Sequence, residues 1–218
     1  MRKIAIEQLD ALFAAISAAM PLYLPVDTKG GAKFDRWTPE KTLSDKLNTV
    51  RSAKDLFFPQ TENLMDFKVS GKKVEIINTR REDEDFAVFG VRACDVRSLA
   101  VLDRVFLAEP VDSFYKNRRD HGIILSMACT RPAETCFCGT FGIDAAAPEG
   151  DVVCFRTADA LYLDAKTEKG AALLERVADL TAECGDEAVL EQQKLIRERL
   201  AKLPLAGLSA EAFGAGKT

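Results

Sequence analysis

The sequence predicts an α/β protein with a mixed, partly parallel sheet flanked by helices, and with helices near its N- and C-terminal ends. Apolar stripes of helical spacing lie toward both ends of the chain. Between them, short strand-like apolar runs alternate with a further helical stripe, a pattern typical of a parallel sheet with helical crossovers. We expect one domain over residues 1–203 and a flexible tail or linker over residues 204–218, where glycines recur.

The first predicted helix ends at Pro21, because proline cannot continue a helical stripe. The stripe consists of Leu9, Leu12, Phe13, Ile16 and Met20. Residues 22–26 are expected to form a short strand, and residues 34–37 a second extended piece after a polar turn. Between residues 39 and 67, charged and apolar residues alternate irregularly, and here we expect one or two helices.

The middle of the chain predicts two strands, a helix and a third strand. Residues 74–77 and 86–91 are β-type runs separated by a charged turn at residues 80–85. Asp95 is a candidate cap for the helix that follows. Its apolar stripe consists of Leu99, Leu102, Val105 and Phe106. Residues 122–127 are a short apolar run, and the strand–helix–strand order predicts that it lies parallel to residues 86–91 as a neighbour.

The last third of the sequence predicts two strands and two helices. The strands are expected over residues 151–156 and 160–164, joined by a short turn. The helices are expected over residues 168–180 and 185–203.

The composition excludes several classes of protein. Hydrophobic residues make up 47% and charged residues 29%, the balance of a globular protein in water. The longest apolar stretches reach about six residues, whereas a membrane span needs about 20. Glu7 and Asp10 interrupt what would be the apolar core of a secretory signal, so we expect a cytoplasmic protein. The net charge of -4 argues against a nucleic-acid partner.

Four of the six cysteines carry the strongest chemical signal. Cys94 follows one predicted strand and Cys129 follows its parallel neighbour, so both are expected at the same sheet edge, where ligands of α/β proteins bind. Cys136 and Cys138 are one residue apart, and extended backbone would point both toward the same side. In a reducing compartment, clustered thiols favour a metal or iron–sulfur site over disulfides.

The charges near these cysteines favour thiolates. Cys94 lies at the predicted N-terminus of a helix, where free N–H groups stabilise negative charge. Arg92, Arg97 and Arg131 are nearby cations that would stabilise an anionic cluster. Structural zinc sites more often use cysteine pairs separated by two to four residues, which the C-x-C pair fits poorly.

Other interpretations stay open. Each cysteine taken alone is more often a core residue than a ligand, and for Cys154 and Cys184, which have no neighbouring thiol, a core or surface role is favoured. His121 is the single histidine, so a metal site would depend mainly on thiolates and carboxylates. A thiol enzyme with a Cys–His pair is the least favoured hypothesis, because no third orienting group can be named.

Four segments resemble the family of the soluble hydrogenase (sulfhydrogenase) β-subunits and the electron-transfer subunits of anaerobic sulfite reductase. They are K-D-L-F-F-P-Q-T-E (residues 54–62), F-G-V-R-A-C-D-V-R-S-L (89–99), D-R-V-F-L (103–107) and C-T-R-P-A-E-T-C-F-C-G-T-F-G (129–142). The resemblance covers residues 34–180. It implies an iron–sulfur protein of anaerobic metabolism in which Cys94, Cys129, Cys136 and Cys138 hold a [4Fe–4S] cluster, without a substrate of its own.

Members of that family usually continue into a ferredoxin-like domain with two further cysteine motifs, and no C-x2-C-x2-C-x3-C-P run occurs in this sequence. We therefore expect one link of a longer electron path, with the glycine-containing tail as an interdomain linker. The leading hypothesis is an electron-transfer domain or subunit of a multisubunit oxidoreductase, working between a ferredoxin-type module and a flavin or metal-centre partner. The alternative is a scaffold domain, zinc-binding or metal-free, that docks partner subunits.

Overall fold

The structure is a computed structural model that describes residues 1–77 and 84–213. Within these residues, eight strands form one sheet in the order β10-β1-β9-β8-β7-β6-β2-β3. The strands are β1 (Arg2–Ala5), β2 (Leu22–Thr28), β3 (Gly31–Arg36), β6 (Phe86–Arg92), β7 (Gly122–Met127), β8 (Val152–Arg156), β9 (Ala160–Ala165) and β10 (Ala182–Glu183). Strands β2, β6, β7 and β8 are adjacent and run parallel, and the strands on either side of them pair antiparallel. The predicted mixed, partly parallel sheet is confirmed.

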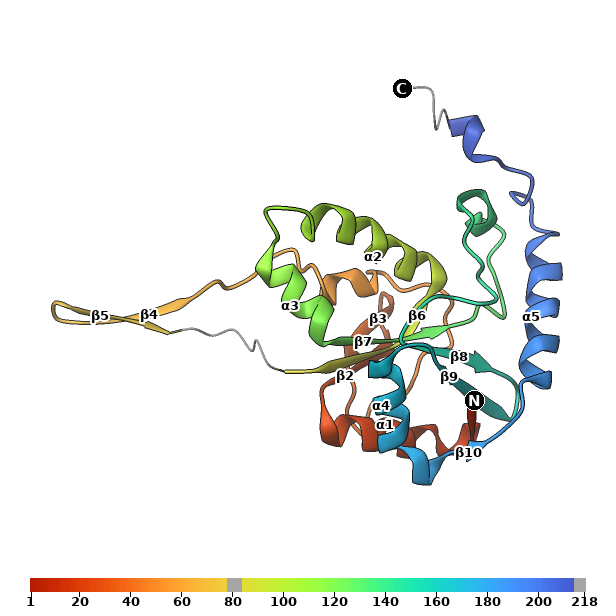
Figure 1. The fold of residues 1–218 in the computed structure, drawn as a ribbon, viewed down its shortest axis with the longest axis horizontal. Helices are drawn as coiled ribbons and strands as arrows, with labels where there is room; N and C mark the ends of the chain where they lie inside the picture. Colours follow the sequence, from red (N-terminus) through yellow and green to blue (C-terminus); the bar gives the residue numbers. More distant parts are fainter. Residues whose placement is uncertain (78–83, 214–218) are drawn as a thin grey trace.

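Helices cover both faces of this sheet (Figure 1). They are α1 (Leu9–Ala19), α2 (Ala93–Phe106), α3 (Ser113–His121), α4 (Glu168–Arg176) and α5 (Glu187–Leu200). Helices α2 and α3 lie on one face, and α1 and α4 lie on the other. Short 3-10 turns complete the described chain at η1 (Ile6–Gln8), η2 (Ala53–Leu56), η3 (Cys138–Phe141), η4 (Ala178–Leu180) and η5 (Ala210–Phe213). In the described part of the chain, no helix has the length and apolar character needed to cross a bilayer.

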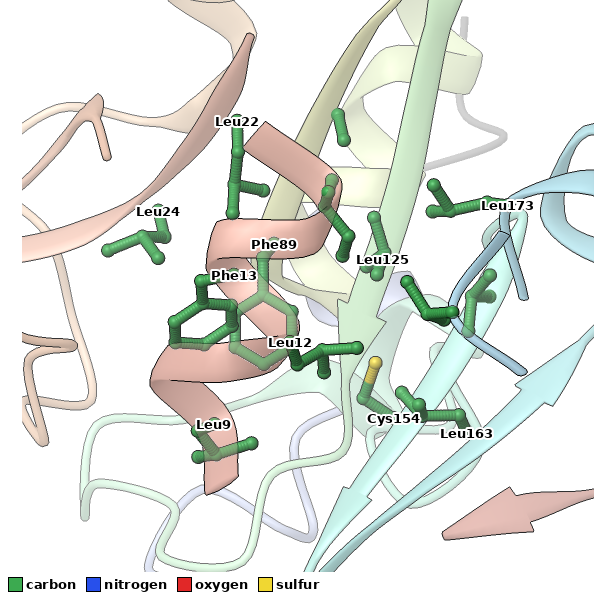
Figure 2. Close-up of a cluster of buried hydrophobic side chains, with 14 of the residues drawn as sticks. Leu9, Leu12, Phe13, Leu22, Leu24, Phe89, Leu125, Cys154, Leu163 and Leu173 are labelled. Carbon is green, nitrogen blue, oxygen red and sulfur yellow. The ribbon is translucent and has the colours of Figure 1, made fainter. Parts of the chain in front are cut away.

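The largest core lies between the sheet and helices α1 and α4. Figure 2 shows Leu9, Leu12 and Phe13 of α1 directed at strand residues, with Cys154 among them. The Phe13 ring meets the Phe89 ring edge to face, with centroids 5.0 Å apart. The helical stripe predicted for residues 9–20 is therefore the buried face of α1, and Cys154 is a core residue, as expected.

The prediction of one or two helices between residues 39 and 67 is wrong. Among these residues the structure has only the short turn η2 and the start of β4 (Asp66–Ser70). Leu43 and Thr49 instead form isolated bridges to Val26 and Ala32, so this segment runs along β2 and β3. It lacks an apolar stripe of helical spacing, and tertiary contacts with the sheet decide its path.

Asp95 is also not the cap of its helix. Helix α2 begins at Ala93, with Arg92 in the capping position, which makes Asp95 a residue of the first turn. Its carboxylate accepts a hydrogen bond of 2.6 Å from the Ser52 hydroxyl. This bond joins the segment before η2 to the start of α2. The charged turn predicted at residues 80–85 falls largely on residues 80–83, which lie outside the described residues.

A two-stranded hairpin, β4 and β5 (Lys73–Ile77), extends away from the body of the protein (Figure 1). Phe67 pairs with Ile76, and Val69 pairs with Val74, so the four apolar side chains share one face. Their exposed fractions are between 59% and 69%. An isolated hairpin of this kind is marginally stable in water, and its apolar face is uncovered in the described structure.

Helices α2 and α3 are joined by a charged hydrogen-bond network. The carboxylate of Asp103 accepts bonds from the Tyr115 hydroxyl (2.6 Å) and from Nε and Nη2 of Arg119 (2.8 and 2.9 Å). Burial alone would raise the pKa of Asp103, but the bonds from Arg119 and Tyr115 outweigh it and hold this pKa below its usual value. Because the pKa of Asp103 is lower in the folded state than in the unfolded chain, its ionised carboxylate stabilises the fold at pH values above the unfolded-state pKa. That stabilisation is lost as the pH falls through the folded pKa.

Asp103→Asn is expected to lower the free energy of unfolding by about 2 kcal/mol at neutral pH, because hydrogen bonds to a charged group are lost. The difference from the parent protein should be smaller at about pH 3, because acid below the unfolded-state pKa begins to remove the stabilisation that the ionised carboxylate supplies. Urea unfolding of the variant and the parent at both pH values measures this difference in the free energy of unfolding. The control is Asp120→Asn, whose exposed pair with Lys116 should contribute less than about 0.5 kcal/mol. An Asp103→Asn deficit that is the same at both pH values would contradict this account.

Candidate metal centre

Cys94 and Cys129 lie at the same edge of the sheet. Strands β6 and β7 are parallel neighbours whose last paired residues are Arg92 and Met127, which confirms the predicted geometry. Cys94 is the second residue of α2, directly after β6, and Cys129 is the second residue after β7. Both cysteines therefore follow the carboxyl ends of adjacent strands.

The loop after β7 brings Cys136 and Cys138 back to this edge. The Cys129 N–H donates to Ala145 O (2.9 Å), and the Ile143 N–H donates to Cys138 O (3.1 Å), so the two arms of the loop lie together. Cys138 packs against a buried cluster made of Ala93, Cys129 and Ala145. The start of α2, the end of β7 and the returning loop meet at this cluster.

The backbone between Cys136 and Cys138 is not extended, contrary to expectation. Phe137 has φ -138° and ψ 33°, and Cys138 opens the short turn η3. The ring of Phe137 packs against that of Phe141, and both rings are largely exposed. A tight turn therefore sets the direction of the Cys138 side chain, and the alternation of a strand does not apply here.

The four cysteines lie in one region of the protein, and Cys94 and Cys138 are paired directly. All are unpaired by disulfides; Cys94 is exposed, Cys129 is buried, and Cys136 and Cys138 are half-buried. The Cys94 and Cys138 side chains are hydrogen bonded, and Cys129 and Cys138 both lie within reach of the charges of Cys94 and Cys136. Within residues 1–77 and 84–213, no three His, Cys, Asp or Glu side chains are close enough together to hold a metal ion.

The negative charge of this group concentrates on Cys94. The hydrogen bond from Cys138 lowers the pKa of Cys94 to about 7, and the backbone N–H groups of Cys94 and Asp95 at the start of α2 act in the same direction. The same bond raises the pKa of Cys138, which keeps the shared proton. Burial raises the pKa of Cys129, and the nearby Arg92 guanidinium partly offsets this. Arg92 also donates to Ala128 O at 3.4 Å.

Helix α5 holds the cysteine loop from outside, a role that the sequence did not suggest. Arg197 pairs with Asp144 at 2.7 Å, and Arg199 donates to Thr130 O at 2.5 Å. Figure 1 shows the loop standing between α2 and α5. Beyond α5, Leu208 O accepts a bond of 2.9 Å from the Thr140 hydroxyl. In the sequence, the only indication of these contacts is the pair of basic residues in the last turn of α5, Arg197 and Arg199.

His121 and Cys184 lie apart from the four thiols. His121 is the last residue of α3, before β7 begins, and its ring contacts Asp85 at 2.8 Å. The six residues of β7, about 20 Å of extended chain, separate His121 from the cysteine edge. His121 is therefore too far away to form a catalytic pair with Cys129. Cys184 follows the edge strand β10, where its N–H donates to Met1 O. Arg97 is exposed on α2, and Arg131 is exposed in the cysteine loop.

The fold and the site define an α/β protein with a cysteine-containing loop at the carboxyl edge of its parallel strands. The chain is similar to the sulfhydrogenase 2 subunit beta of Pyrococcus furiosus, with 26% identity over 208 residues. The match covers 95% of this chain and 60% of the relative, so the chain spans less than two thirds of that protein. No protein-family profile matches the sequence, and no solved structure matches it. The resemblance to a hydrogenase β subunit is confirmed.

Proposed function

We propose that this chain is an iron–sulfur electron-transfer domain or subunit of a cytoplasmic, multisubunit oxidoreductase of the hydrogenase or sulfite reductase type. Residues 1–203 form the cluster-binding domain, and residues 204–218 act as its tail or linker. The observation that carries the proposal is that Cys94 and Cys129 follow the ends of adjacent parallel strands, with Cys138 packed beside Cys129, in a chain similar to a hydrogenase β subunit.

The donor set suits a [4Fe–4S] cluster. Cys94, Cys129, Cys136 and Cys138 would each bind a different iron, so their sulfurs need not meet at one point. Such a cluster, when bound, supplies the reversible uptake and release of one electron. The start of α2 supplies backbone N–H groups to the Cys94 sulfur, and Arg92 supplies a cation beside Cys129. Both would stabilise the negative charge of four thiolates and raise the potential of the site.

The exposed face of the β4–β5 hairpin supports a subunit that works inside a complex. The hairpin projects from the body (Figure 1), and its four apolar side chains are exposed. Contiguous exposed apolar patches commonly mark sites of protein interaction. The relative named above is itself a subunit. We propose that the partners are other subunits of the complex, one carrying a ferredoxin-like module and one carrying a flavin or a metal centre. Electrons would pass between them through this domain.

Anaerobic purification of the full chain, followed by iron and acid-labile sulfide analysis, tests the proposal. We expect about four iron atoms and about four sulfide ions per chain, and a paramagnetic signal after reduction with dithionite. A chain that contains no iron and also fails to take up iron and sulfide in reconstitution overturns it. Stoichiometric zinc with sulfur ligation in X-ray absorption would also overturn it and would support the zinc-binding scaffold instead.

A further inference from the structure

A second feature of the carboxyl edge is a cavity of about 390 Å³ next to the cysteine site. Its walls come from the ends of β6, β7 and β8, and its size lies in the range of small-molecule sites. Three arginines line it: Arg92 at the end of β6, Arg131 in the cysteine loop and Arg156 at the end of β8. Residues far apart in the sequence thus bring three guanidinium groups to one cavity.

These arginines are only partly neutralised. Asp45 is the one carboxylate among the described lining residues, and it pairs with Arg156 at 2.8 Å. Arg92 and Arg131 make no ion pair with the described residues. The cavity therefore carries an excess of two positive charges, which a dianion matches better than a monoanion. Guanidinium groups also bind phosphate through paired hydrogen bonds.

The rest of the wall suits an apolar body. Pro25, Phe89 and Met127 line the cavity together with the arginines. Strand β6 has a bulge at Gly90, where φ is 86°, and a Cβ at this position would lie 3.2 Å from the Pro25 ring. Bulges of this kind often occur beside functional sites. On the far side, the Gln192 amide donates to Arg156 O at 2.6 Å and fixes the backbone that carries Arg156.

We infer that this cavity binds a small organic phosphate, with the phosphate dianion on Arg131, which has no ion pair among the described residues, and on Arg156, where it competes with Asp45, and with an apolar body against Pro25 and Met127. The inference does not depend on the cysteines holding a cluster. A phosphate monoester carries close to two negative charges at neutral pH, which meets the charge excess of the cavity. The apolar wall distinguishes an organic phosphate from the free ion.

The test is calorimetric titration of the full chain with phenyl phosphate, benzenesulfonate and inorganic phosphate at low salt. Phenyl phosphate should bind at least about tenfold more tightly than either comparison ligand, because only it combines a dianion with an apolar ring. Arg131→Gln and Arg156→Gln should each weaken its binding about tenfold or more. Arg176→Gln, an exposed arginine outside the cavity, is the matched control and should leave binding unchanged.

Asp45→Asn provides a test in the opposite direction. Removal of the only described carboxylate frees Arg156 and should tighten phenyl phosphate binding severalfold. A gain in affinity cannot result from misfolding. The inference is overturned if phenyl phosphate and benzenesulfonate bind equally, if none of the three binds, or if the Arg131 and Arg156 variants bind phenyl phosphate like the parent. Loss of iron in the arginine variants without any phosphate binding would overturn it too and would assign the arginines to the cysteine site alone.

Discussion

Serine in place of any one of Cys94, Cys129, Cys136 or Cys138 is expected to remove more than about half of the iron from the anaerobically purified protein. A cluster held by four thiolates has one ligand per iron, and a serine oxygen is a harder, poorer ligand for iron in such a cluster. Iron and sulfide are measured per folded chain, with circular dichroism as the check on folding. Comparable losses at all four positions are the expected result.

Cys184→Ser is the matched control for this series. Cys184 is half-buried, as Cys136 and Cys138 are, but it follows β10 at the far edge of the sheet. Its replacement should leave the iron content within error of the parent. Iron that is retained in all four site variants would contradict the proposed ligand set, and a loss at Cys184 equal to the losses elsewhere would point to general instability.

Sequence reasoning predicted the positions of Cys94 and Cys129 correctly where it rested on chain topology. A strand, a crossover helix and a second strand leave one favoured arrangement, a parallel neighbour, so the positions of Cys94 and Cys129 followed from their place after each strand. Cys154 was assigned to the core because it lies within a strand pattern without a nearby thiol, and its side chain is fully buried. Such local and topological rules need no knowledge of distant contacts.

The parts that sequence reasoning missed depend on distant contacts. Strand β1 is only four residues long and exists through its pairing with β9 and β10, which are more than 150 residues away in the chain. Arg199 contacts Thr130 O across the cysteine loop, and no local pattern indicates such a bond. Asp95 looked like a cap because Asp often fills that position, yet the helix begins two residues earlier. The turn at Phe137 likewise replaced the expected extended backbone.

The second large effect is expected at Gly170 in the first turn of α4, where the helix meets the start of β8. A Cβ at this position would lie 2.0 Å from the Asp151 backbone oxygen and 2.7 Å from its carbonyl carbon. Asp151 is fixed in turn, because its carboxylate accepts bonds from the Ile124 N–H (2.8 Å) and the Thr167 hydroxyl (2.6 Å). The atoms that an added Cβ would meet belong to the Asp151 backbone and not to a flexible side chain. The helix itself would therefore have to shift.

Gly170→Ala is therefore expected to lower the free energy of unfolding by about 3 kcal/mol, because overpacking against backbone exceeds the gain of up to about 1 kcal/mol from alanine's higher helix propensity. Urea unfolding followed by circular dichroism measures the change. Gly30→Ala is the control, since a Cβ there meets no atom within 4 Å, and its effect should stay within about 1 kcal/mol. A Gly170→Ala protein as stable as the parent would mean that α4 does not pack as closely on β8 as the structure describes. A deficit near 3 kcal/mol would instead support the close approach of α4 to the start of β8, which glycine at position 170 allows.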